Sequence, residues 1–76
     1  MDTIICHNSE SIQSIKLKNE NTIIIFYRKP ANKGYEYNIK KNYWEELIEF
    51  NNENKGLGIN RKINEYLKFG IITKTT

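Results

Sequence analysis

The sequence predicts an α+β fold, with a three-stranded antiparallel sheet, or a four-stranded one, followed by two helices packed on one face. Three observations predict it. Short segments rich in β-branched and aromatic residues alternate with turn residues through residue 39. Apolar residues then recur at helical spacing between Asn42 and Phe69, on either side of a glycine-containing break. The length of 76 residues fits a single small domain spanning residues 1-76.

The first two strands are expected one after the other, separated by a turn. From Ile15, apolar residues alternate with Lys16 and Lys18, which suits a half-buried strand. After a turn at residues 19–21, the segment Thr22–Tyr27 is β-branched and aromatic. This predicts a central strand that is buried on both faces, or on one face with a partner covering the other.

Two further segments complete the predicted sheet. Residues 28–34 contain the single proline and a glycine, and are expected to form a loop. Residues 35–39 alternate again, so they should pair antiparallel with Thr22–Tyr27 across that loop. Residues 1–6 are apolar and form either a short strand or an ordered arm.

The two helices are bounded by capping signals. Asn42 is a good N-cap residue for the first helix, and Gly56 is a natural C-terminal stop. Glutamates in the first turns suit the positive end of this helix. The apolar stripe of the second helix begins at Ile59, and the helix should run to about Phe69 with Gly70 as its C-cap. The two isoleucines that follow fold back or join an interface.

Charge is distributed unevenly along the chain, which has a net charge of +3. No Lys or Arg lies between Asn42 and Asn54, where there are four glutamates. The remainder of the chain has 12 basic and 5 acidic residues. Two explanations stay open: the glutamates solvate a helix face, or the acidic helix turns away from a basic surface for phosphate-bearing ligands.

Composition and length exclude several classes of protein. No apolar run approaches the roughly 18 residues of a membrane span, and the N-terminus lacks the features of a signal peptide. A single cysteine cannot form an internal disulfide, so we expect a cytoplasmic protein. The small core favours a homo-oligomer. Abundant Ile, Asn and Lys suggest an A/T-rich bacterial or phage genome.

Catalytic chemistry is hard to build from this sequence. His7, the single histidine, follows Cys6, and neighbouring residues on a strand point to opposite faces. No other His or Cys is present to complete a zinc site. The glycines at 56 and 58 lie between two helices and not after a strand, so they predict a turn and not a phosphate loop. We therefore expect no enzyme activity, no catalytic or metal-binding residue and no cofactor.

Roughly from residue 11 to residue 66, the chain resembles the KTSC domain, a small module found at the C-terminus of some lysyl-tRNA synthetases. The matching positions are Ser11-Ile12-Gln13-Ser14-Ile15, Thr22–Tyr27, Tyr35-Glu36-Tyr37, Ile39, Trp44, Leu47, Asn54-Lys55-Gly56, Ile59-Asn60 and Ile63. The chain departs from the family pattern at Leu17, Lys40 and Asn54, where that pattern has tyrosine, proline and serine. The resemblance implies an α+β fold and a non-enzymatic accessory or binding module, and carries no residue role over.

The sequence favours a binding site, because it places lysines and arginines next to tyrosines. Lysine and arginine supply charge for phosphate, while aromatic rings can stack on bases. The expected ligand-binding residues are Arg28, Lys29, Lys33, Tyr35, Tyr37, Lys55, Arg61 and Lys62. The tyrosines are instead core residues if they face the helices. The predicted ligand is a nucleic acid or a nucleotide. The alternative is a phage-encoded inhibitor of host defence, which binds a host protein or sequesters a nucleotide signal.

Overall fold

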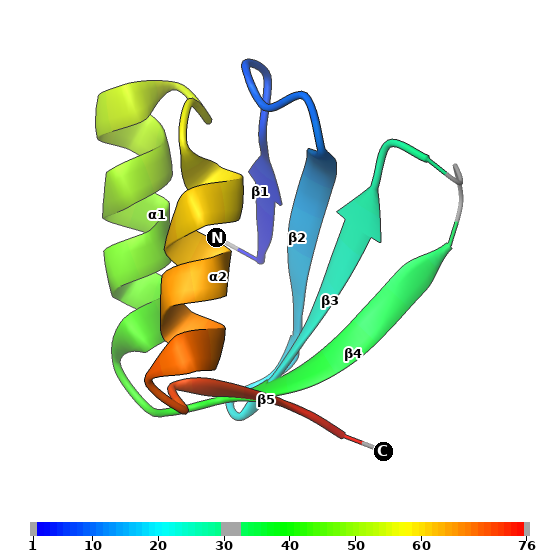
Figure 1. The fold of residues 1–76 in the computed structure, drawn as a ribbon. Helices are drawn as coiled ribbons and strands as arrows, with labels where there is room; N and C mark the ends of the chain where they lie inside the picture. The colour runs from blue at the N-terminus through cyan, green and yellow to red at the C-terminus, as the bar shows by residue number, and fades with distance from the viewer. Residues whose placement is uncertain (1, 30–32, 76) are drawn as a thin grey trace.

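The computed structural model describes residues 2–29 and 33–75 of the chain. In these residues an antiparallel sheet of five strands packs against two helices (Figure 1). The elements in order are β1 (Thr3–Ile5), β2 (Ile12–Asn19), β3 (Thr22–Tyr27), β4 (Gly34–Ile39), α1 (Tyr43–Asn54), α2 (Ile59–Lys68) and β5 (Ile72–Lys74). The strand order in space is β1-β2-β3-β4-β5, so each strand lies beside its neighbours in sequence.

The α+β class and the two helices on one face are confirmed, but the sheet is larger than predicted. The N-terminal segment does form a strand, and β1 pairs with β2, with Ile4 opposite Ile15. A fifth strand, β5, was not predicted as such. It pairs antiparallel with β4, with Ile72 opposite Ile39. Three residues are too few to show an alternating pattern, so only the return of the chain after α2 reveals this strand.

Both helices cover the same face of the sheet (Figure 1). Ile4, Ile15 and Ile25 lie side by side on that face, and each is at most 1% exposed. On β3, Ile23 and Ile25 are buried whereas Ile24 and Phe26, on the opposite face, are half-buried. The central strand is therefore buried on one face within this chain. The helices contribute Trp44, Leu47, Ile59, Ile63 and Tyr66 to the core.

The helix boundaries agree with the predicted signals, although one cap works differently. Asn42 occupies the N-cap position of α1, but its φ is 77° and its side chain makes no capping hydrogen bond. It is in the left-handed conformation, which asparagine tolerates better than most residues. At the other end of α1, Lys55 and Gly56 have φ values of 51° and 87°. Helix α2 ends at Lys68, and Gly70, at φ 72°, follows its C-cap residue.

Candidate functional site: the loop end of the domain

Three connections meet at one end of the domain, which we call the loop end. They are the β1–β2 loop (residues 6–11), the described part of the β3–β4 loop (residues 28, 29 and 33) and the α1–α2 turn (residues 55–58), toward the top of Figure 1. The β1–β2 loop lies between the other two and is bonded to both. The Asn8 amide donates to the carbonyl oxygen of Lys55 at 3.2 Å, and the Arg28 amide donates to that of Ser11 at 3.0 Å. The fold thus joins basic segments that are far apart in sequence.

Arg28 has a structural role within the loop end. Its Nε donates a hydrogen bond to the carbonyl oxygen of Ser9 at 2.6 Å, and its Nη2 donates to that of Cys6 at 2.7 Å. The sequence pointed to Arg28 as a ligand-binding residue. In the folded chain its guanidinium holds the β1–β2 loop, because the end of β3 lies beside carbonyl groups of that loop that need donors.

The α1–α2 turn approaches the β1–β2 loop closely at Gly56. A Cβ atom added to Gly56 would lie 3.0 Å from the carbonyl carbon of Cys6 and 3.1 Å from the amide nitrogen of His7. Gly56 therefore does more than end α1, because it allows two backbones to touch. Cys6 is fully buried while His7 is exposed. Burial raises the pKa of the Cys6 thiol to about 11, against a smaller lowering by Arg28.

The predicted tyrosines face the helices. Tyr37 is only 5% exposed, so its ring offers no surface for a stacked base. Tyr35 is half-buried, with its ring edge-on to Tyr27 at a centroid distance of 5.6 Å and the Lys33 ammonium 5.4 Å from its centroid. Burial, followed by a hydrogen bond with Tyr37, raises the pKa of Tyr27 to about 12. The rings of Tyr27, Tyr35 and Tyr37 pack at one end of the core, and the Lys33 ammonium lies over the ring of Tyr35.

Two of the predicted cations, Arg61 and Lys62, line a hollow of about 410 Å³ between the end of α1 and the start of α2. Its lining residues are Phe50, Asn54, Leu57, Gly58, Arg61, Lys62 and Glu65. Arg61 is exposed, and so is the neighbouring Lys55. Phe50 is half-buried and Leu57 is 67% exposed, so the hollow has apolar as well as basic walls. The sequence predicted the cations of this site but not its apolar part.

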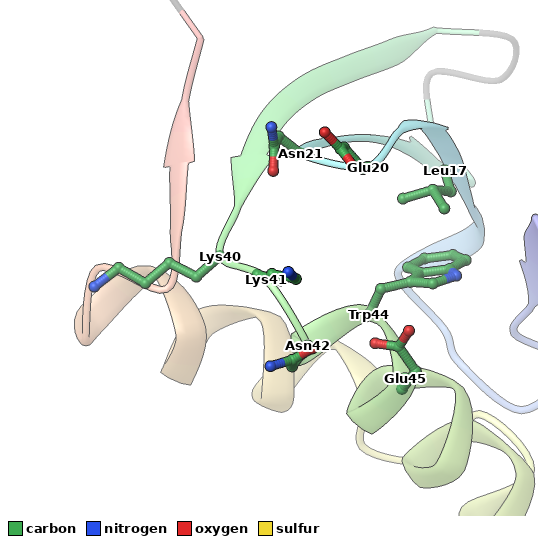
Figure 2. Close-up of a pocket in the computed structure, with 8 residues that line it drawn as sticks. All are labelled: Leu17, Glu20, Asn21, Lys40, Lys41, Asn42, Trp44 and Glu45. Atoms are coloured by element: carbon green, nitrogen blue, oxygen red, sulfur yellow. The ribbon is translucent and has the colours of Figure 1, made fainter.

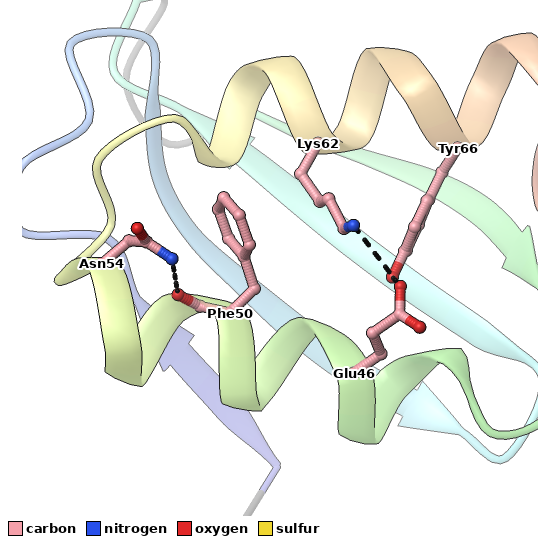
Figure 3. A network of polar contacts seen from close by, with 5 residues as sticks. All are labelled: Glu46, Phe50, Asn54, Lys62 and Tyr66. Atoms are coloured by element: carbon pink, nitrogen blue, oxygen red, sulfur yellow. Dashed lines mark hydrogen bonds and ion pairs between the residues drawn. The ribbon is translucent and has the colours of Figure 1, made fainter.

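Lys62 is held inside the groove between the helices (Figure 3). Its ammonium lies 3.5 Å from the Glu46 carboxylate and 5.5 Å from the centroids of both Phe50 and Tyr66. The Tyr66 hydroxyl also donates a hydrogen bond to Glu46. Burial, together with this carboxylate, raises the pKa of Tyr66. Lys62 is thus oriented beside the hollow, with part of its charge balanced by Glu46.

A second hollow, of about 280 Å³, lies at the opposite end of the domain (Figure 2). It is lined by Leu17, Glu20, Asn21, Lys40, Lys41, Asn42, Trp44 and Glu45. In Figure 2 the Lys40 side chain extends away from the hollow, and the Trp44 ring lies beneath Leu17. Two lysines and two glutamates line this hollow, whereas the hollow at the loop end has two cations and one glutamate, so the loop end suits an anion better. Lys40 and Lys41, the adjacent lysines just before α1, are the feature of the sequence that could have indicated this hollow.

The described residues contain no group of three or more His, Cys, Asp or Glu side chains that could hold a metal ion. Neither α1 nor α2 is long and apolar enough to cross a membrane. The fold and the loop end define a small α+β domain with a basic, partly apolar hollow between two helices. Comparisons of the chain with protein-family models, with curated proteins and with solved structures give no match.

Proposed function

We propose that this chain is a non-enzymatic binding module for a phosphate-bearing ligand, either a nucleic acid or a nucleotide, which docks at the loop end. The observation that carries the proposal is that the β1–β2 loop is hydrogen-bonded to two basic segments that are distant in sequence. Lys29 and Lys33 flank the β3–β4 loop, and Lys55 and Arg61 flank the α1–α2 turn. Clustered cations on one surface raise the local concentration of phosphate ligands. The resemblance to the KTSC domain supports a binding module.

Within the loop end, the hollow between the helices is the better-defined part of the proposed site. Arg61 and Lys62 supply charge for phosphate, and Phe50 and Leu57 supply apolar contact for a base or sugar. Arg28 acts indirectly, by holding the β1–β2 loop between the two basic segments. Tyr35 and Tyr37 contribute through packing and not through stacking on a base.

The test is a binding titration with a labelled single-stranded oligonucleotide and a panel of nucleotides, at about 50 mM and about 300 mM salt. We expect binding to weaken steeply with salt, because phosphate contacts release counterions. Replacing Lys55 and Arg61 by alanine should weaken binding by about tenfold or more. Replacing Lys40 and Lys41 by alanine removes the same charge at the opposite end and is the matched control. Equal losses in the two variants would show that only net charge matters and would refute this site.

The second candidate function is that of an interaction protein, including a phage-encoded inhibitor that acts in the cytoplasm by binding a host protein or sequestering a nucleotide signal. The observation in its favour is Leu57, which is 67% exposed at the loop end. Exposed apolar side chains that gather into a patch mark protein interfaces, and Leu57 lines the same hollow as Phe50. Binding through such a patch should persist at high salt and should be lost in Leu57→Ala, whereas binding of a phosphate ligand should be lost at high salt.

A further inference from the structure

The outward surface of the helical pair carries opposite charges on its two helices. On α1, Glu45, Glu49 and Glu53 are exposed at a spacing of four residues, and the helix has no Lys or Arg. On α2, Arg61 and Lys68 are exposed, and the helix has a net charge of +2 from three cations and one glutamate. Residues four apart lie on one side of a helix. Each copy of the chain therefore presents an acidic stripe on α1 beside a stripe on α2 that is basic at both ends, with the exposed Glu65 between Arg61 and Lys68.

Contacts between the helices show how the two stripes are aligned. Glu46, near the start of α1, contacts Lys62 and Tyr66, and Phe50, one turn later, contacts Lys62. The helices therefore run antiparallel, as Figure 3 shows. The start of α1 lies level with the end of α2, and the end of α1 lies level with its start.

This alignment sets the heights of the exposed charges. Glu45 in the first turn of α1 is level with Lys68 in the last turn of α2. Glu53 in the last turn of α1 is nearest in height to Arg61, in the first turn of α2. The acidic stripe of one copy therefore matches the basic stripe of a second copy, charge for charge at both ends.

Apolar surface accompanies these charges at both ends of α2. Leu57, just before the helix, is 67% exposed, and Phe69, just after it, is 63% exposed. The hollow of about 410 Å³ beside Leu57 is followed along α2 by a second hollow of about 450 Å³ that Phe69 lines. Arg61 borders both hollows. The outward side of α2 is thus a shallow depression with an apolar residue at each end, a shape that suits a helix from a partner.

We propose that the partner is a second copy of this chain, in a two-fold symmetric dimer built from the outward surfaces of both helices. With the two-fold axis parallel to the helices, α1 of one copy lies on α2 of the other, and the reverse holds at the same time. Arg61 of each copy then faces Glu53 of the other, and Lys68 faces Glu45. Such an interface is closed, so assembly stops at two copies.

Three features favour a second copy over another partner. A chain of 76 residues has a small core, and shared burial is a common way to stabilise one. The surface is complementary to itself, since it offers both charge signs at matching heights. Leu57 and Phe69, the two most exposed of the large apolar residues described, both lie along this surface. The dimer requires no ligand, so it stands independently of the proposed function, although a phosphate ligand that uses Arg61 would compete with it.

The test is sedimentation velocity of the full chain over a range of concentrations, at low and high salt. The wild-type chain should form a dimer that weakens with salt, because charge pairs at a rim are screened. A variant with Glu45→Lys and Glu53→Lys should be monomeric under conditions where the wild type is dimeric. A variant with Arg61→Glu and Lys68→Glu should be monomeric as well.

An equimolar mixture of these two variants is the decisive sample. In each variant the end positions of α1 have the same charge as the end positions of α2 that they face. In the mixed dimer these positions again face their opposites, so the dimer should return. Glu10→Lys with Glu20→Lys makes the same change in net charge away from the helices, and this control should still dimerise. A monomeric wild type, a dimer that survives in either helix variant alone, or a mixture that stays monomeric would each overturn the proposal.

Discussion

Nη2 of Arg28 donates a hydrogen bond to the carbonyl oxygen of Cys6 at 2.7 Å, and so fastens the end of β3 to the β1–β2 loop. These residues are 22 positions apart in sequence. The same guanidinium bonds the carbonyl oxygen of Ser9. A side chain that the sequence marks as a ligand-binding cation is therefore part of the scaffold on which the loop end is built.

Arg28→Ala should destabilise the fold by about 1–3 kcal/mol, the usual cost of removing hydrogen bonds made by a charged group. Denaturant unfolding followed by circular dichroism measures this change. Lys29→Ala removes the same charge from the next, exposed position and should change stability by less than about 0.5 kcal/mol. If the two variants have the same free energy of unfolding, the contacts of Arg28 contribute nothing to stability. Arg28 is then again a candidate phosphate-binding residue.

Gly56→Ala should destabilise the chain by more than Gly70→Ala does. Both glycines have positive φ, 87° and 72°, so both substitutions carry the backbone cost of about 1 kcal/mol. At Gly56 the new Cβ would also lie 3.0 Å from the Cys6 backbone, whereas at Gly70 it would meet nothing within 4 Å. The difference between the two free energies of unfolding isolates the steric cost. Equal losses would mean that the β1–β2 loop moves aside without cost.

Stability should fall at alkaline pH through Tyr27. Its pKa is raised from 10.0 to about 12 in the folded chain, chiefly by burial. Because the folded state holds this proton more tightly, the contribution to stability is complete below pH 10 and is lost as the pH rises towards 12. Unfolding free energies measured across this range should show the fall. Tyr27→Phe, which has no group to titrate, should show a smaller one, and an unchanged slope in that variant would assign the effect to other residues.

The Cys6 thiol should react slowly with a thiol reagent in the folded chain. The side chain is fully buried, and burial raises its pKa from 9.0 to about 11, so little thiolate is present or accessible at pH 8. The rate should rise by orders of magnitude in urea. Arg28→Lys, which shortens the reach to Cys6 and Ser9 while keeping the charge, should increase the rate in the folded state if opening of the β1–β2 loop limits access. Rapid labelling of the native wild type would contradict the burial of this residue.

Much of the fold can be predicted from local sequence patterns. The apolar positions of α1 and α2 recur at helical spacing, and glycines at 56 and 70 follow each helix because few other residues adopt positive φ. The apolar run of β3 and the alternating pattern of β4 each predict a strand. In a strand, every second side chain points to the same face, so alternate residues of each can face the helices. For the candidate site, the sequence names the cations Arg61 and Lys62 but not the apolar residues beside them, and the role of these cations in binding stays a prediction.

The remaining features depend on tertiary contacts, and the reason is the same for each. Strands β1 and β5 have three residues apiece, too few for a pattern, so their pairing depends on where the folded chain returns. Tyr37 packs inward because of its register opposite Ile23. Arg28 binds backbone carbonyls because folding brings the β1–β2 loop beside it. Local sequence determines the conformation and periodicity of a segment, whereas the partner of a side chain depends on contacts between residues that are distant in sequence.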